Sequence, residues 1–200
     1  DFCLSRGLGD VYKRQLYNKM TRLIITNGKL ILPDRIETDK ALICKDGKIE
    51  QIVSEEALEL LPDDQIMDAG QQYVSPGFID MHIHGGGGHD FMDGTTEAFL
   101  GIAETHAQYG TTAMVPTTLT STNDELMNIF ATYQKAKVLN TRGAKFIGLH
   151  LEGPYFSPGQ CGAQDPQYLK KPRPEEYNII LEACLLYTSP SPRDRQKSRM

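Results

Sequence analysis

Strand–helix alternation in the second half of the chain restricts its possible folds more than any other feature. Three short apolar runs are each followed by a helical segment, and the runs lie at 77–81, 112–116 and 146–151. The first helical segment spans 96–109, the second carries apolar residues from Leu126 to Tyr133, and the third begins near Pro174. Continuously apolar strands separated by helices favour a parallel sheet with right-handed crossovers. Either a doubly wound sheet or a (β/α)8 barrel begins with such units.

The chain before Pro76 has a different pattern, made of short strands separated by turn signals. Asp46-Gly47 lies between two apolar runs and predicts a tight hairpin. A second pair of strands is expected around residues 68–70, and a short helix over 55–61. These features predict a small antiparallel sheet that ends at Pro76-Gly77.

The first apolar run of the alternating half leads directly into two histidines, His82 and His84. Residues two apart in a strand point to the same side, and the carboxyl ends of barrel strands carry active sites. Neutral imidazole suits zinc, iron and other first-row divalent ions. Most His-x-His pairs are ordinary surface histidines, but here an apolar strand precedes the pair and glycines 85–88 follow it. We therefore predict that both histidines are metal ligands.

The third apolar run leads into His150 and Glu152. A carboxylate at the carboxyl end of a strand can bind a divalent ion or bridge two of them, so Glu152 is a candidate for a further metal ligand. We expect His150 to support the site by hydrogen bonding rather than by ligation. Loop or supporting roles are expected for His89 and Asp90, a structural role for His106, and no reactive role for Cys161.

Two segments carry a resemblance to known families. Residues 76–85, Pro-Gly-Phe-Ile-Asp-Met-His-Ile-His-Gly, resemble the signature of the amidohydrolase superfamily, and residues 148–156, with His-Leu-Glu-Gly-Pro, resemble the N-acetylglucosamine-6-phosphate deacetylases. The resemblance implies an α/β protein with an amidohydrolase-type (β/α)8 TIM barrel, preceded by part of a small β-sandwich. Residues 20–75 would be the partial sandwich, and residues 76–183 the first three βα units of the barrel.

The resemblance also implies a set of site residues. His82, His84 and Glu152 would hold one or two divalent ions, zinc or iron, with Glu152 as the bridge between two. Ala163 and Gln164 fall where the family contacts the sugar, and Gln164 replaces the usual histidine. Glutamine retains hydrogen bonding but cannot carry the charge of a histidine. The remaining histidine ligands and the general acid–base aspartate are expected beyond residue 183, so we expect no catalysis from this chain alone.

The implied reaction is hydrolysis of N-acetylglucosamine 6-phosphate to glucosamine 6-phosphate and acetate, with the full-length protein expected to be a homodimer. Two alternatives stay open at this point. One is another amidohydrolase, such as a cyclic amidase or a deaminase, against which His-Leu-Glu-Gly-Pro argues. The other is a short, non-catalytic protein that binds a sugar or a metal.

The two ends of the chain carry an inverted repeat at the DNA level. Residues 10–15 can be encoded by GAT GTG TAT AAG AGA CAG, and the reverse complement, read in another frame, encodes residues 184–189. We interpret residues 1–15 and 184–200 as adaptor-like artefacts. Met20 is then a suitable start, and we expect the natural chain to continue past Ala183.

Charge and cysteine content limit the possible partners. The flanks hold seven of the 21 basic and three of the 26 acidic residues, so without them the net charge moves from −5 to −9. An acidic chain argues against a nucleic-acid partner, and no run approaches the roughly 20 apolar residues of a membrane span. Outside the flanks, Cys44 and Cys161 lack a CxxC spacing, which suggests reduced thiols in a cytoplasmic protein.

Overall fold

The computed structural model describes residues 2–3 and 22–183, which fall into two compact units. Of the described residues, the first unit comprises 2–3, 22–79 and 106–112, and the second comprises 80–105 and 113–183. The adaptor-like flanks lie outside the described residues, except for a short strand at Phe2–Cys3.

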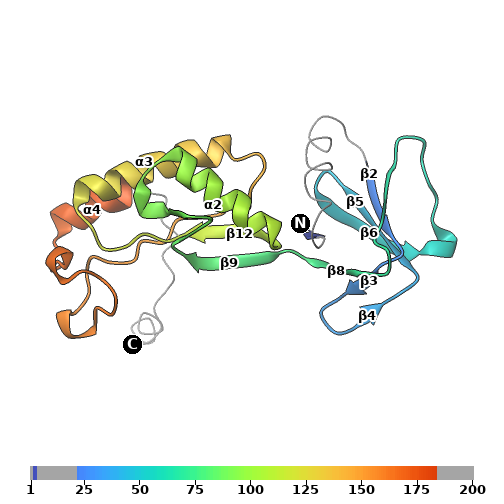
Figure 1. Cartoon of the computed structure of the whole chain (residues 1–200), viewed down its shortest axis with the longest axis horizontal. Coiled ribbons are helices and arrows are strands. Elements are labelled where there is room, and N and C mark those ends of the chain that lie inside the picture. The colour runs from blue at the N-terminus through green and yellow to red at the C-terminus, as the bar shows by residue number, and fades with distance from the viewer. Residues whose placement is uncertain (1, 4–21, 184–200) are drawn as a thin grey trace, which may run out of the picture. The chain divides into compact units, whose positions relative to one another are not determined.

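The first unit contains two four-stranded sheets (Figure 1). One has the order β6-β5-β2-β7, with β2 (Arg22–Thr26), β5 (Lys40–Lys45), β6 (Lys48–Ser54) and β7 (Gln65–Asp68). The other has the order β1-β8-β3-β4, with β1 (Phe2–Cys3), β3 (Lys29–Ile31), β4 (Ile36–Glu37) and β8 (Tyr73–Pro76). The buried side chains of this unit are mostly aliphatic, including Ile24, Ile25, Leu42 and Val74.

The pairing of these strands corrects part of the sequence prediction. The hairpin between β5 and β6 is confirmed, with Asp46 and Gly47 both at positive φ in its turn. However, β2 pairs with β7 and β3 pairs with β8 in parallel, so the sheets are mixed rather than antiparallel. The predicted helix over 55–61 is only the 3-10 turn Glu55–Ala57, which buries no residue. A turn without a buried face lacks the packing that normally stabilises a short helix.

The second unit is built on a three-stranded sheet of order β13-β12-β9, formed by β9 (Phe78–Ile83), β12 (Thr111–Pro116) and β13 (Lys145–Phe146). Strands β12 and β13 are parallel, as predicted. The three predicted helices are also present, as α2 (Thr96–Gln108), α3 (Asn123–Leu139) and α4 (Pro174–Ala183). The third predicted strand is shorter than expected, but Ile147 and His150 still donate backbone hydrogen bonds to Met114 and Pro116.

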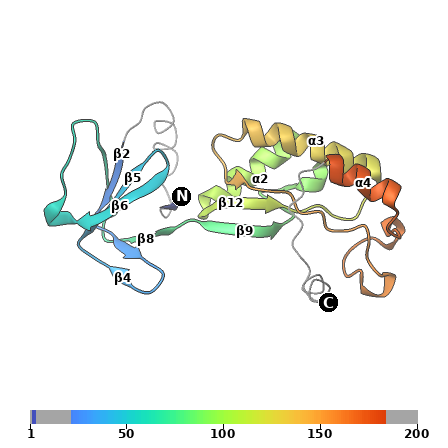
Figure 2. The ribbon, with the colours of Figure 1, turned by 180° about the vertical axis from the view of Figure 1, so that it is seen from behind.

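The helices pack on the sheet through one apolar core. Phe99 and Ile102 of α2 and Leu126 and Phe130 of α3 meet strand residues such as Met114, and all five are buried. Both views show α2 and α3 along the same side of β9 and β12 (Figures 1 and 2). This arrangement fixes the carboxyl ends of neighbouring strands relative to one another, because each strand is followed by a helix anchored in the same core.

Side-chain caps define where the helices begin. Thr95 Oγ1 accepts from the backbone N–H of Ala98 in the first turn of α2. Thr122 and Glu125 form a reciprocal capping box at the start of α3. Among the described residues, no helix is long and apolar enough to cross a membrane.

Candidate metal centre

His82 and His84 lie at the carboxyl end of β9, where the sequence placed them. Between them, Ile83 is buried and anchors the strand end, because its N–H donates to Thr117 Oγ1 and its C=O accepts from Thr117 N–H. With Ile83 directed into the core, both histidine side chains point to the opposite side of the strand. Their ring centroids are 5.1 Å apart.

The glycines after His84 form a minimal hairpin rather than an open loop. Strand β10 (Gly85–Gly86) pairs with β11 (His89–Asp90), and the two-residue turn between them, Gly87-Gly88, has φ values of 63° and 84°. Positive φ at both turn positions is typical of a type I′ hairpin and is accessible to glycine without strain. The hairpin therefore gives the segment after His84 a defined path.

Glu152 is brought to the histidines by the parallel register of the next segments. Residues Thr117 and His150 form a parallel bridge, and Thr118 N–H donates to His150 C=O over 2.9 Å. The N–H of Glu152 donates to Thr118 Oγ1 at 3.2 Å. Its carbonyl is 3.5 Å from Thr120 Oγ1, which donates to it. The backbone of Glu152 is thus held on both sides by buried threonines.

Three side-chain atoms converge at this point. Glu152 Oε2 lies 3.2 Å from His82 Nε2 and 3.2 Å from His84 Nε2, and the three ligand atoms are all within 4.8 Å of one another. Both distances would suit ion pairs with protonated histidines. Yet Glu152 Oε2 is buried and has no hydrogen-bond partner among the described groups, so neither ring N–H is aimed at it.

An unpartnered buried carboxylate oxygen fits a metal ligand better than an ion pair. Ligand atoms about 2.0–2.1 Å from a tetrahedral zinc ion lie about 3.3–3.4 Å apart, close to the two distances of 3.2 Å between Glu152 Oε2 and the histidine nitrogens. Two imidazole nitrogens and one carboxylate oxygen are also a common donor set for zinc and iron. The residues present therefore fit a divalent ion, and the structure brings together the three that were predicted as its ligands.

His150 stands beside this triad without joining it. Its ring centroid is 5.1 Å from that of His82. Burial lowers the pKa of His150, and the neighbouring His82 lowers it further. A neutral imidazole at this place can donate or accept a hydrogen bond, in keeping with the supporting role expected for it.

The threonines beneath the triad were not singled out in the sequence. Thr117, Thr118 and Thr120 are buried polar residues, and each of them hydrogen-bonds the segments that carry Ile83 or Glu152. Five of the six residues over 117–122 carry a hydroxyl, directly after an apolar strand, and this is the signal that could have identified them. Hydroxyls there satisfy backbone groups where the strands diverge.

The remaining predicted residues lie in three different places. Ala163 is exposed, whereas Gln164 is buried and accepts from Thr120 N–H through its Oε1 at 2.7 Å. Asp90 caps the 3-10 turn Phe91–Asp93, and His89 packs over Gly101 of α2. His106 lies in the last turn of α2, and Cys161 is half-buried with its thiol donating to the Pro158 carbonyl.

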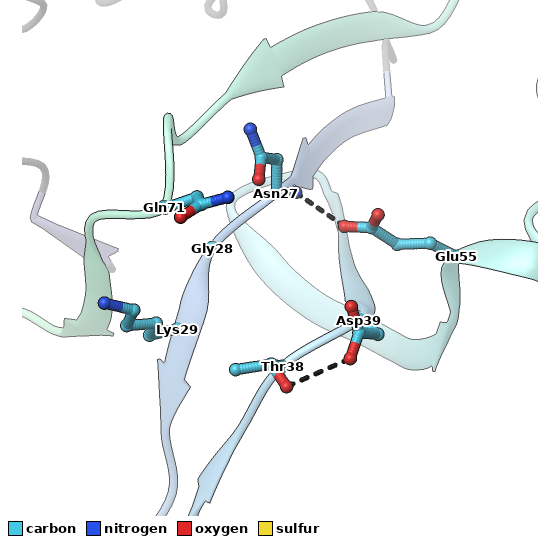
Figure 3. Close-up of a pocket in the computed structure, with 7 residues that line it drawn as sticks. All are labelled: Asn27, Gly28, Lys29, Thr38, Asp39, Glu55 and Gln71. Atoms are coloured by element: carbon cyan, nitrogen blue, oxygen red, sulfur yellow. Dashed lines mark hydrogen bonds between the residues drawn. The ribbon is translucent and has the colours of Figure 1, made fainter.

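A pocket of about 200 Å³ occurs in the first unit, away from these residues in the sequence (Figure 3). Both carboxylates that line it accept hydrogen bonds from neighbouring residues of the same unit. Glu55 accepts from Asn27 N–H at 2.5 Å, and Asp39 accepts from Thr38 Oγ1 at 3.1 Å. Among the described residues, neither belongs to a group of three potential metal ligands, and the group that could hold a metal ion, His82, His84 and Glu152, lies in the second unit.

Residues 73–187 match the sequence model of the amidohydrolase family. The chain belongs to this family. Several of its relatives are N-acetylglucosamine-6-phosphate deacetylases. It is 37% identical over 103 residues to an N-acetylglucosamine-6-phosphate deacetylase of Vibrio furnissii, covering 52% of this chain and 26% of that protein.

Two further relatives extend the comparison. The chain is 32% identical over 118 residues to an N-acetylgalactosamine-6-phosphate deacetylase of Escherichia coli O157:H7, covering 58% of this chain and 30% of that protein. The crystal structure of an N-acetylglucosamine-6-phosphate deacetylase from Pasteurella multocida superposes with a TM-score of 0.72 at 25% identity, over 81% of this chain and 42% of that one. This amidohydrolase chain thus spans less than half the length of each of these three proteins.

Proposed function

We propose that this chain is the metal-binding part of a deacetylase that hydrolyses N-acetylglucosamine 6-phosphate to glucosamine 6-phosphate and acetate. The observation that carries the proposal is the convergence of His82, His84 and Glu152 around an unpartnered carboxylate oxygen. It is supported by family membership and by the deacetylase activity for which the relatives are named.

The proposed architecture is that of the amidohydrolases. Residues 76–183 would supply the first three βα units of a (β/α)8 barrel, with α2, α3 and α4 on its outer face. Residues 20–75 would supply part of a small β-sandwich. In such a barrel the carboxyl ends of the strands form the active-site mouth, and His82, His84 and Glu152 all follow strand ends.

The proposed ligands divide the work of binding and orientation. When bound, a divalent ion, zinc or iron, polarises a carbonyl oxygen and lowers the pKa of water toward neutrality. Glu152 Oε2 lies equally close to both histidine nitrogens, so it is the donor placed to serve either one ion or two. His84 Nδ1 is buried without a hydrogen-bond partner among the described groups. We expect a residue beyond Ala183 to form a hydrogen bond with this nitrogen.

Substrate contacts are proposed at Ala163 and Gln164. Ala163 is exposed and leaves its backbone groups accessible to a sugar. The Oε1 atom of Gln164 is already bonded to Thr120, so only its Nε2 group is left to donate to a sugar hydroxyl. A neutral amide at this place contributes hydrogen bonding but no charge toward the phosphate, which must be recognised by other groups.

The test is acetate release by the full-length protein that carries this sequence. N-Acetylglucosamine 6-phosphate and N-acetylgalactosamine 6-phosphate are compared at equal concentration, because relatives of both activities match this chain. A kcat/KM at least about tenfold higher for the glucosamine derivative is expected. The reverse preference would overturn the proposed substrate, and no release from either sugar by metal-loaded protein would overturn the proposed reaction.

A further inference from the structure

Thr120 is a junction between the proposed metal ligand and a distant loop. Its backbone N–H donates to Gln164 Oε1 at 2.7 Å, across 44 residues of sequence, and its hydroxyl donates to the Glu152 carbonyl at 3.5 Å. It also lies against Gly153, where an added Cβ would come within 2.2 Å of Thr120 Oγ1. A displacement of Thr120 is therefore transmitted directly to the backbone on both sides of the Glu152–Gly153 bond.

Gln164 is a buried residue in the middle of a loop, and most of its neighbours there are exposed. The loop leaves the site at Pro154 and returns at Lys170, whose backbone N–H donates to the Pro154 carbonyl at 3.0 Å. Lys170 Nζ closes the base further by donating to Asn123 Oδ1 at 2.6 Å and to Glu176 Oε1 at 2.7 Å. Such a compact loop with adjacent ends keeps its own shape.

The bond from the Thr120 N–H to Gln164 Oε1 attaches the middle of the loop. Residues 157–160 are exposed, whereas Gln164 is only 6% exposed and Thr120 is equally buried. A buried N–H that loses its acceptor is costly, because no water replaces the bond. The Thr120 N–H therefore relies on Gln164 Oε1 as its acceptor, and the same bond holds the middle of the loop in position.

We propose that Gln164 is a positioning residue that holds Glu152 in its ligating place through Thr120. This inference rests on the proposed role of Glu152 as a metal ligand. It adds a task for Gln164 distinct from contact with a sugar: its Oε1 fixes the site, while its Nε2 remains for substrate. Removing the acceptor should weaken metal binding even when no sugar is present.

The experiment compares three variants of the full-length protein. Gln164→Met keeps the length of the side chain and removes the acceptor oxygen. Gln164→Glu keeps an acceptor oxygen in either protonation state. Gln160→Ala, at an exposed position in the same loop, is the matched control. Zinc affinity is measured by chelator competition without substrate, and the exchange rate of the Thr120 amide hydrogen is measured alongside it.

Supporting contacts of metal ligands typically contribute 10–100-fold to metal affinity, so a loss of about tenfold or more is expected in Gln164→Met. The Thr120 amide should exchange faster in that variant, and the absorption spectrum of bound cobalt should change. Gln164→Glu and Gln160→Ala should stay within about threefold of wild type in zinc affinity. Circular dichroism shows whether a variant is globally unfolded. If Gln164→Met is unfolded, Gln164→Glu provides the test: the positioning role predicts that this variant keeps both the slow exchange of the Thr120 amide and the zinc affinity of wild type.

Unchanged zinc affinity in folded Gln164→Met, with only KM for the sugar raised, would overturn the positioning role and leave a substrate contact. Equal loss in Gln164→Glu and Gln164→Met would also overturn it, because the acceptor would then be irrelevant. The zinc affinities and the Thr120 amide exchange rate are measured without substrate, so they do not depend on deacetylation. If the wild-type protein binds zinc in a Gln164-dependent way but hydrolyses neither sugar phosphate, the proposed function fails while this inference stands.

Discussion

At the scale of single residues, the decisive atom is Glu152 Oε2. It stands 3.2 Å from each of two imidazole nitrogens and receives no hydrogen bond from a described group. Leaving a carboxylate oxygen buried in this way is unfavourable unless a cation or a donor satisfies it. The Glu152 side chain as a whole is 24% exposed, so solvent offsets part of this cost. The convergence of the three side chains does not depend on that exposure.

Glu152 should therefore be the most important of the three proposed ligands. In the full-length protein, Glu152→Ala is expected to lose most bound metal and essentially all deacetylation, because the carboxylate serves both histidine positions. The double variant His82→Ala, His84→Ala is expected to lose about one metal ion per chain and to keep some activity. Elemental analysis of purified protein measures both. Equal metal content in Glu152→Ala and wild type would end the assignment.

Gly153 offers a second test at the same scale, because it combines a backbone requirement with a close contact. Its φ is +94°, and an added Cβ would lie 2.2 Å from Thr120 Oγ1. Gly153→Ala should therefore destabilise the folded protein by about 1–3 kcal/mol and weaken zinc binding. Gly159→Ala is the control, since a Cβ there meets nothing within 4 Å. Denaturant unfolding and chelator competition measure the two effects; indistinguishable values for both variants would contradict the argument.

At the scale of elements, local sequence signals predicted the helices better than the strands. The apolar spacing of Leu126, Ile129 and Tyr133 matches the buried face of α3, and the turn at Asp46-Gly47 matches a hairpin. Such features depend on neighbours in sequence. The parallel pairs β2–β7 and β3–β8 join segments about 40 residues apart, and nothing local distinguishes them from antiparallel pairs.

In the candidate site, too, the features that depend on local sequence were predicted and those that depend on long-range contacts were not. His82, His84 and Glu152 follow apolar runs, so their position at strand ends could be derived from the sequence. The bond between Thr120 and Gln164 could not, because it needs the path of an irregular loop. A glutamine in a loop is usually exposed, and only the tertiary arrangement shows that this one is buried.

The capping box of α3 provides a test of an element directly behind the site. Thr122 Oγ1 accepts from Glu125 N–H at 3.3 Å, and the Glu125 carboxylate accepts from Thr122 N–H and from the hydroxyls of Ser121 and Thr122. Thr122→Ala should cost about 1 kcal/mol of local stability. Ser157→Ala is the control, since Ser157 begins a 3-10 turn without a side-chain cap. Native-state hydrogen exchange in α3 should rise only in Thr122→Ala.

Acid should reduce this difference. Hydrogen bonds from Ser121 and then Thr122 lower the pKa of Glu125 in the folded protein. A carboxyl group with a lowered folded pKa stabilises above its unfolded value of about 4.3, and the contribution is lost as pH falls through the folded value. The gap between wild type and Thr122→Ala, measured by denaturant unfolding, should therefore narrow below about pH 4. If the difference in stability widened in acid, the stabilising effect of the cap would not come from the ionised Glu125 carboxylate.

At the scale of the whole molecule, the chain accounts for part of an amidohydrolase. It spans 26–42% of the three relatives described above. We expect the natural gene to continue in frame past Ala183 and to supply two histidines and one aspartate at further strand ends. Genomic sequence across that codon is the measurement. A stop codon soon after residue 183 would contradict the expectation and favour a short binding protein.

The second unit exposes apolar side chains that a self-sufficient domain would bury. Met81 in β9 is 73% exposed, and Ile179 and Leu181 in α4 are 58% and 50% exposed. Within the described residues, β9 and β13 are the two outer strands of a three-stranded sheet, so each presents one unpaired edge. Exposed apolar groups beside open strand edges promote association between chains.

Residues 20–183 expressed alone should therefore fail to form a stable, monomeric unit. The parallel strands also gain little from local contacts, so their pairing must wait for the remainder of a barrel. Expression, size-exclusion chromatography and thermal unfolding provide the test, and aggregation or a broad transition is the expected result. The full-length protein is the matched control and should unfold cooperatively. A soluble monomer of residues 20–183 with a sharp transition would show that three βα units suffice for a stable fold. That result would favour the alternative of a short protein that binds a metal or a sugar.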